Sequence, residues 1–255
     1  MKESPQGRDV YFEFAWVYDQ ALGRRFFRAA APLLDRLLDR YPTDTKTHLD
    51  VACGTGLAVA HMRDRGWTSA GLDGSLAMLR VARRRASRLV AADFRAIPFR
   101  SNFSRVTCLY DSFNHLLEPH DLLQTFQAVA SIMREDSLFI FDVNQPAVYP
   151  RIWGLREPYI SAGADYRLVM HTRYTAATEL GVADLSGWAK VGGRRVGISE
   201  RHRQRAWSAE HIETALRRAS LEIVERIDFD PFDENGENGP GVKWVYVVKT
   251  VAGSG

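Results

Sequence analysis

The 255-residue sequence has only two cysteines, Cys53 and Cys108, and they lack the spacing of a metal site, a redox motif or a disulfide framework. It has no apolar run long enough to span a membrane, and no internal repeat or low-complexity tract. We expect no signal peptide, because no apolar stretch follows the charges of residues 1–7. These absences favour a cytoplasmic protein without membrane contact and without a bound metal.

An excess of charge of one sign is also lacking, since 34 basic residues against 31 acidic ones leave a net charge of +3. Lysine is scarce: there are 5 lysines against 29 arginines, and the arginines run from Arg8 to Arg226 without forming a patch. A balanced chain of this kind gives no indication of a nucleic-acid partner. With 45% hydrophobic residues, it can bury the core of one large domain, or of a domain of about 150 residues with an appendage.

The hydrophobic pattern predicts strands that alternate with helices over residues 48–145. Residues 10–41, ahead of Pro42, present one apolar face at helical spacing. Strands are expected at 48–53, 68–73, 89–93, 103–110 and 137–143, and helices at 57–65, 75–88 and 119–133. Strands and helices that alternate at this interval form right-handed crossovers, and therefore a parallel sheet.

After Pro146 the pattern changes. Residues 164–206 alternate polar and apolar side chains with a period of two and have turns at 179–181 and 192–193, which predicts an inserted antiparallel sheet. A helix at 208–220 and strands at 221–229 and 242–250 follow, and segment 233–241 reverses the chain between these strands. The expected fold is α/β: a doubly wound sheet of seven strands, the last antiparallel, with an inserted antiparallel β lid.

Polar side chains stand where four of the predicted strands end, which is the edge where open α/β sheets bind ligands. These tips carry Asp50 with the turn Gly54-Thr55-Gly56, then Asp73, then Asp93-Phe94, then the run Tyr110-Asp111-Ser112-Phe113-Asn114-His115. The dinucleotide fingerprint fails, because Val59 stands where it requires glycine or alanine, and the charge of Asp50 would oppose a pyrophosphate. An adenosine with an ammonium-bearing tail and no phosphate fits these carboxylates better.

Three of these segments, in this order and spacing, resemble the first three motifs of class I S-adenosylmethionine-dependent methyltransferases. They are Leu49-Asp50-Val51-Ala52-Cys53-Gly54-Thr55-Gly56, Gly71-Leu72-Asp73-Gly74-Ser75 with Met78, and Ala92-Asp93-Phe94 with Ile97-Pro98-Phe99. Ala52 departs from the pattern, since many members have glycine there. The resemblance covers residues 48–145 and extends to about 250, and it implies a Rossmann-like fold.

The resemblance implies a cofactor, S-adenosylmethionine, and a set of residues that bind it. At the methionine end, Gly54, Gly56 and the neighbouring Ala52 would border the methionine moiety, and Asp50 would bind its ammonium. Asp73 would bind the ribose hydroxyls, and Asp93 would accept a hydrogen bond from the amino group of the adenine. The adenine would be bordered by Leu72, Gly74, Met78 and Phe94, and the pocket would be completed by Tyr18 and Tyr110. Tyr18 belongs to Phe14-Ala15-Trp16-Val17-Tyr18-Asp19, which is similar to a segment that closes over the cofactor in small-molecule members.

Catalysis of methyl transfer from a sulfonium depends mainly on positioning in a dry pocket, although some acceptors also need a base. The candidates are His115, Asp111 and Asn114, because the family places this strand tip beside the transferable methyl. His115 is a base near neutral pH or an orienting side chain. Asp142 and Asn144, at the next strand tip, are weaker candidates.

The division expected is a helical cap at 1–47, a cofactor-binding domain at 48–145 and 207–251, and an acceptor-binding lid at 146–206. Aromatic residues of the insertion would line the acceptor site or form the small core of the insertion itself.

The primary interpretation is methyl transfer to nitrogen or oxygen of a small metabolite of sugar, amine or amino-acid type, by a monomer or homodimer. The alternatives are a non-catalytic cofactor-binding subunit, or a tRNA or protein methyltransferase; residues 111–114 are unlike the Asn/Asp-Pro-Pro-Tyr motif of base-methylating enzymes.

Several other polar residues have simpler interpretations. Asp19 fits a helix cap or a solvated loop, and the arginines of 80–88 fit a solvated helix face. His61, His120 and His211 lack partner spacing and are expected at the surface.

Overall fold

A computed structural model describes residues 11, 14–100, 103–232 and 241–251. Seven strands form one sheet in the order β10-β11-β5-β4-β1-β2-β3. The strands are β1 (Thr47–Val51), β2 (Thr68–Asp73), β3 (Leu89–Ala91), β4 (Phe103–Cys108), β5 (Met133–Asn144), β10 (Leu221–Phe229) and β11 (Lys243–Thr250). All pairs are parallel except those of β11, which runs antiparallel to both β5 and β10. The predicted doubly wound sheet with an antiparallel last strand is confirmed.

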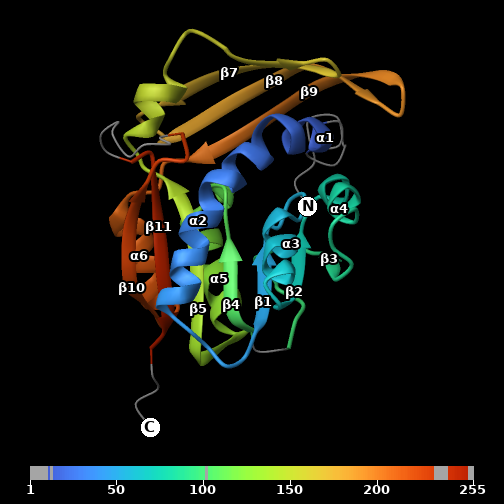
Figure 1. Ribbon diagram of the computed structural model, residues 1–255. Helices are drawn as coiled ribbons and strands as arrows, with labels where there is room; N and C mark the ends of the chain where they lie inside the picture. The colour runs from blue at the N-terminus through green and yellow to red at the C-terminus, as the bar shows by residue number, and fades with distance from the viewer. Residues whose placement is uncertain (1–10, 12–13, 101–102, 233–240, 252–255) are drawn as a thin grey trace.

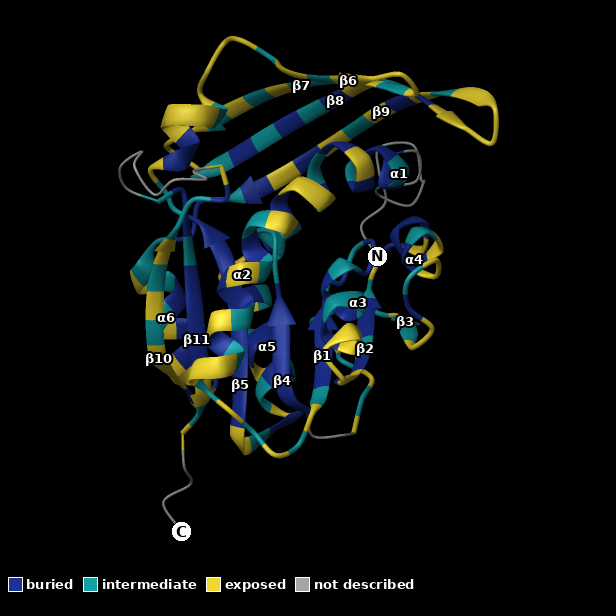
Figure 2. Cartoon of the chain, viewed as in Figure 1, coloured by how far each residue is buried: buried dark blue, intermediate teal, exposed yellow. Residues whose placement is uncertain are grey.

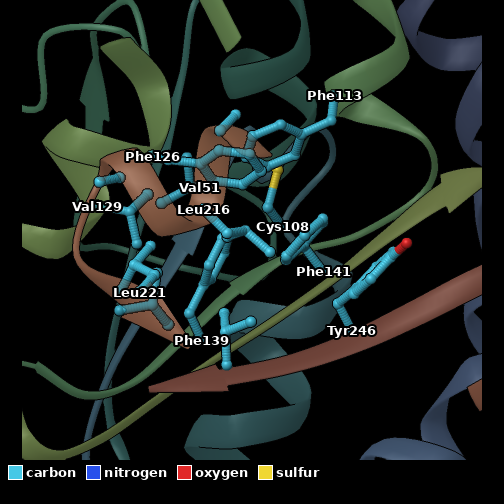
Figure 3. Packing of buried hydrophobic residues seen from close by; sticks show 14 of the residues in the cluster. Val51, Cys108, Phe113, Phe126, Val129, Phe139, Phe141, Leu216, Leu221 and Tyr246 are labelled. Atoms are coloured by element: carbon cyan, nitrogen blue, oxygen red, sulfur yellow. The ribbon is translucent and has the colours of Figure 1, made fainter. Parts of the chain in front are cut away.

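Helices cover both faces of this sheet (Figure 1). One face packs against α2 (Arg24–Arg40) and α3 (Leu57–Asp64), and the other against α5 (Pro119–Ala130) and α6 (Ala209–Arg218). The second face holds the larger core, in which rings of Phe113, Phe126, Phe139, Phe141 and Tyr246 stack (Figure 3). Each central strand therefore buries both sets of alternating side chains.

The predicted insertion is a four-stranded antiparallel sheet between β5 and α6. Its strands are β6 (Tyr159–Gly163), β7 (Tyr166–Thr175), β8 (Leu180–Val191) and β9 (Arg194–Arg205), and a π-helix, η3 (Tyr149–Trp153), precedes them. The sheet lies across the end of the molecule toward which β4 points, and α1 (Ala15–Tyr18) and η1 (Asp19–Gly23) lie beneath it (Figure 1). Along β8, buried residues alternate with half-buried ones over the first half of the strand, and its last two residues are exposed (Figure 2).

The inserted sheet shares its core with the N-terminal helices. Leu168, Leu185 and Ile198 pack with Phe14 and Val17, so the first helix fills the space beneath the sheet. Of the insertion's aromatic residues, Trp153 and Tyr166 pack at the border of this core, whereas Tyr159 is exposed. The buried residues that the inserted sheet contributes to this shared core are thus aliphatic, whereas Tyr149 of η3 is wholly buried beside Trp153 and Tyr174.

Several predicted elements have different bounds, three of them for reasons that the structure shows or by several residues. The helix expected to run to residue 88 is α4 (Leu76–Ala82); it starts as expected at the cap Ser75, but Ala86 is buried against Leu79, so the chain turns inward. The fourth strand ends at Cys108, because the next residues adopt a left-handed backbone. β5 begins four residues early, at Met133. The expected reversal at 233–241 and the residues 1–7 lie, apart from Gly241, outside the described residues.

No helix in the described ranges is both long enough and apolar enough to cross a membrane.

Candidate active site

A glycine turn connects β1 to α3. Gly54 and Gly56 have φ of +52° and +78°, a backbone region that suits glycine. A Cβ on Gly56 would lie 3.0 Å from the Cβ of Ala82, so α4 also requires glycine there. Ala52 adopts φ of +57°, the conformation for which the family usually supplies glycine. At these two glycines, therefore, backbone atoms of the turn can contact its neighbours or a ligand without a side chain between them.

Asp73 fixes this turn from the neighbouring strand. Its Oδ2 accepts a hydrogen bond of 2.7 Å from the amide of Gly54, and its Oδ1 accepts one of 2.8 Å from the amide of Ser75. One carboxylate at the end of β2 thus holds both the glycine turn and the start of α4. This position, predicted for ribose recognition, is rigid before any ligand binds.

The three strand-tip aspartates end adjacent strands. Asp50 pairs in register with Gly71 near the end of β2, and Asp73 pairs with Ala91 at the end of β3. Burial raises the pKa of Asp50 to about 7, although the hydrogen bond from Thr107 opposes the shift. Asp93 differs, because Arg95 donates to both of its carboxylate oxygens and lowers its pKa.

The N-terminal helices close over the glycine turn. A Cβ on Gly54 would be 4.0 Å from the ring of Tyr18, which places Tyr18 against the turn as expected. The next residue, Asp19, is 1% exposed, and Arg85 donates to both of its oxygens at 2.7 Å while also donating to the carbonyl of Thr55. The expectation that Asp19 and Arg85 are solvated was wrong: they join the N-terminal segment to the cofactor turn.

Tyr110 joins this layer from the end of β4. Its ring lies edge-on to Tyr18, with centroids 5.4 Å apart, and to Phe26, at 4.2 Å. Burial raises the pKa of both tyrosines well above 10, so each keeps its hydroxyl proton at neutral pH. These rings separate the glycine turn from the polar residues described next.

A buried lysine stands at the centre of the fourth strand tip. Lys243, the first residue of β11, lies 2.5 Å from Oδ1 of Asp111, 2.8 Å from Oδ2 of Asp142 and 2.9 Å from Oδ1 of Asn144. Burial alone lowers the pKa of Lys243, but the attraction of the two aspartates outweighs it, and the pKa rises. The ammonium therefore stays charged and holds both carboxylates in place.

The backbone beside Lys243 is strained. Tyr110 and Asp111 have φ of +66° and +51°, a region that costs non-glycine residues about 1–2 kcal/mol each. Both amides donate to the carboxylate of Asp142, which compensates for this conformation. Strained residues of this kind cluster at functional sites, and here the strain aims the Asp111 side chain toward the inserted sheet.

Gln204 of β9 connects this cluster to His115. Its Oε1 accepts from the hydroxyl of Tyr149 and from the Asn144 amide, so its NH₂ group faces Asp111 Oδ2 at 2.5 Å and His115 Nε2 at 3.4 Å. An amide nitrogen only donates, so this contact assigns the ring proton of His115 to Nδ1. A residue of the inserted sheet therefore orients two candidate catalytic side chains.

Asn114 is buried and bonds backbone groups at both ends of its amide. Its Oδ1 accepts from the amide of Asn144 at 2.9 Å, and its Nδ2 donates to the carbonyl of Arg205 at 2.8 Å. These residues are the points where the chain leaves for the inserted sheet and returns from it. Asn114 thus fastens the two ends of the insertion together.

Residues 49–136 match a family of sequences described as a methyltransferase domain. A dTDP-3-amino-3,6-dideoxy-alpha-D-glucopyranose N,N-dimethyltransferase of Streptomyces fradiae is 30% identical over 230 residues, which cover 84% of this chain and 86% of that enzyme. The chain belongs to the class I S-adenosylmethionine-dependent methyltransferases.

Solved structures have the same fold as this methyltransferase. An S-adenosylmethionine-dependent methyltransferase from Clostridium acetobutylicum ATCC 824 has a TM-score of 0.78 at 22% identity, over 94% of this chain and 98% of the other. CalS10, an amino pentose methyltransferase from Micromonospora echinaspora solved with the cofactor bound, has a TM-score of 0.71 at 20% identity, over 95% and 99% of the two chains.

The residues at the strand tips suit the chemistry of the cofactor. The bare turn at Gly54 and the carboxylates of Asp50 and Asp73 offer acceptors for an ammonium and for hydroxyls, and the guanidinium of Arg85, which reaches the turn at Thr55, is paired with Asp19. The structure also places the remaining residues that were predicted to contact the cofactor. Leu72 is wholly buried in the core, and Gly74 directly follows β2. Met78 is buried and packs with Tyr18, and Phe94 packs edge-on against Phe113. In the part of the chain that the structure describes, no group of three or more His, Cys, Asp or Glu side chains is placed to hold a metal ion.

Sequence reasoning missed Lys243 and Gln204 of this methyltransferase, and it misjudged His61. Lys243 had one available signal: it is one of only 5 lysines, and it begins an otherwise apolar strand. Gln204 had none, because its neighbours on β9 alternate without any motif. His61, expected at the surface without a partner, lies 2.8 Å from Asp35 between α2 and α3.

Proposed function

We propose that this methyltransferase methylates an amino nitrogen of a small amino-sugar metabolite in the cytoplasm, at the junction of its two sheets. The observation that carries the proposal is the fixed carboxylate of Asp111, which Lys243 holds beside Gln204 and His115. A carboxylate attracts an amine in its ammonium form, and an imidazole accepts a proton near neutral pH. The names of two relatives support this substrate class, since one acts on an amino sugar and the other on an amino pentose.

The cofactor residues are proposed by position. Asp50 would address the ammonium of S-adenosylmethionine, Asp73 the ribose hydroxyls, and Asp93 the amino group of the adenine, while Gly54 and Gly56 leave room for the methionine chain. Leu72, Gly74, Met78 and Phe94 would border the adenine, and Ala52, Tyr18 and Tyr110 would border the sulfonium side. When bound, the cofactor supplies a methyl group activated by the positive charge on sulfur.

The residues around the acceptor have separate tasks. Asp111 orients the amine, and Nε2 of His115 gives up its 3.4 Å contact with Gln204 to take the proton that the ammonium must lose before nitrogen can attack. Tyr18 and Tyr110 cover the site and exclude water, which strengthens the electrostatic interactions inside. Asn114, although a candidate from sequence, has its amide committed to the backbone, and we assign it to holding the insertion.

The test is a transfer assay with S-adenosylmethionine labelled on its methyl group. The panel pairs nucleotide-linked amino sugars with the matching hydroxyl sugars, and mass spectrometry locates the methyl group. We expect N-methylated product from at least one amino sugar and none from its hydroxyl counterpart; transfer only to oxygen would contradict the proposal.

A pair of histidine variants tests the site itself. His115→Asn should lower turnover by about 100-fold or more while the affinity for S-adenosylmethionine stays unchanged. His120→Asn, at a histidine whose side chain is 82% exposed on α5, should change neither. Cofactor binding without transfer to any member of the panel would favour the non-catalytic alternative, and transfer to tRNA or protein would favour the macromolecular one.

A further inference from the structure

A chain of polar side chains lies buried across the three central strands. Nδ1 of His48 on β1 is 2.7 Å from Oγ of Ser69 on β2, and Nε2 of His48 is 2.9 Å from Oγ1 of Thr107 on β4. Thr107 in turn donates a 2.5 Å hydrogen bond to Oδ1 of Asp50. The chain therefore runs from Ser69 through His48 and Thr107 to the carboxylate at the end of β1.

All four residues point to the same face of the sheet. Leu49, Val51 and Val106, which alternate with them, belong to the core against α5 and α6, so the polar chain lies on the α2 and α3 side. Apolar residues of α2, α3, β5 and β11 pack on that side, together with the buried Arg105, whose guanidinium lies over the ring of Trp67. Buried polar groups in such surroundings add little net stability compared with apolar side chains, so a role in stability alone does not account for them.

The direction of each hydrogen bond follows from donor and acceptor counts. An ionised carboxylate only accepts, so the single hydroxyl proton of Thr107 is committed to Asp50. Thr107 must then accept from His48, which places the ring proton of His48 on Nε2 and leaves Nδ1 to accept from Ser69. Burial lowers the pKa of His48 to about 3, so the ring is neutral over the physiological range and has this one tautomer.

We propose that His48 and Thr107 are positioning residues for the cofactor, because their hydrogen-bond chain holds Asp50 Oδ1 and presents Oδ2 to the ammonium of S-adenosylmethionine. The inference rests on the proposed role of Asp50. No hydrogen bond from a described residue to Oδ2 of Asp50 is found, and the side chain is 3% exposed. Without the Thr107 hydroxyl, this carboxylate would lose its fixed orientation.

The test compares two ligands that differ at the group in question. S-adenosylmethionine has the ammonium, whereas 5′-methylthioadenosine has the same adenosine with a neutral thioether and lacks the amino-acid tail. In calorimetry, Thr107→Val should weaken S-adenosylmethionine by about ten-fold or more, the effect of losing a hydrogen bond to a charged group, and should leave 5′-methylthioadenosine within about two-fold. Thr107→Ser, which keeps the hydroxyl, should restore the wild-type affinity.

A matched control is Thr125→Val, which removes a buried hydroxyl that donates to the carbonyl of Asp121 within α5. It should change neither affinity. Equal weakening of both ligands by Thr107→Val would mean a general loosening and would overturn the proposal, as would no weakening at all.

Asp50→Asn separates this inference from the assignment beneath it. If Asp50→Asn weakens S-adenosylmethionine selectively and Thr107→Val does not, the positioning role alone fails. If Asp50→Asn leaves the affinity for S-adenosylmethionine intact, the proposed cofactor contact itself is wrong. In long-range ¹H–¹⁵N spectra of the wild type, His48 should be neutral with its proton on Nε2; a proton on Nδ1 would contradict the stated direction of the chain.

Discussion

Replacing Lys243 by methionine removes a cation that contacts two carboxylates, the buried Asp142 and the half-buried Asp111. The Lys243 side chain is 4% exposed, and those of Asp111 and Asp142 are 14% and 1% exposed. At 2.8 Å and an effective dielectric constant of about 20, one such pair attracts with about 6 kcal/mol, much of which offsets desolvation. Breaking a buried pair typically costs about 3–5 kcal/mol, because a charge is left without a partner. We expect Lys243→Met to lower the free energy of unfolding by that amount at neutral pH.

The loss should depend on pH in a defined direction. Burial already raises the pKa of Asp142, and without Lys243 it rises further. A carboxyl group whose pKa is higher in the folded protein than in the unfolded chain destabilises the fold increasingly as the pH rises toward the folded value. The difference between wild type and Lys243→Met, measured by urea denaturation, should therefore be larger at about pH 8 than at about pH 5.

The same strand provides the control. Lys249 is also paired with a carboxylate, that of Glu222 at 2.8 Å, but both side chains are 47% exposed. Lys249→Met should cost at most about 1 kcal/mol. Equal losses for the two variants, or a larger loss at low pH for Lys243→Met, would refute the reasoning.

Three further predictions concern the cofactor turn. The pKa of Asp50 is about 7, and only the ionised carboxylate of Asp50 attracts the ammonium of S-adenosylmethionine. The affinity for S-adenosylmethionine, measured by calorimetry, should therefore fall below about pH 7 by up to ten-fold per pH unit. Asp50→Asn should abolish this pH dependence. Arg85→Met removes two hydrogen bonds to the buried carboxylate of Asp19, which keeps Arg24 at 3.0 Å, and should cost about 2 kcal/mol in urea denaturation, whereas the exposed Arg84→Met should cost almost nothing. Gly56→Ala should destabilise more than Gly66→Ala in the same assay, since both have positive φ but only Gly56 lacks space for a Cβ.

The fold and the positions of the residues at the strand ends were largely predictable, because their signals are local. Asp50, the glycine turn and Asp73 lie within single strand-turn-helix units, where spacing along the chain determines position in space. The antiparallel last strand followed from a short connection between two adjacent strands. Strand and helix ends were less accurate where a single contact decides them, as at Ala86, which is buried after α4.

The contacts around Lys243 and Gln204 were not predictable, because they join distant segments. Lys243 meets a carboxylate 132 positions earlier, and Gln204 meets Asp111 across 93 positions. Arg85 reaches Asp19 over 66 positions, although each looked like an ordinary surface residue in sequence. Composition and periodicity indicate which side chains are buried, but the choice of partner among buried charges depends on the packing of the two sheets.

The clamp made by Asn114 has a consequence for how this enzyme family can diversify. Since one side chain bonds both the exit and the return of the chain, the catalytic sheet meets the insertion at a junction only a few ångströms wide. The entropy of closing a loop grows slowly with its length, so this junction tolerates segments of very different size and shape. The inserted sheet can therefore change in size or shape while the seven-stranded sheet is kept, provided that its packing against the N-terminal helices is kept as well.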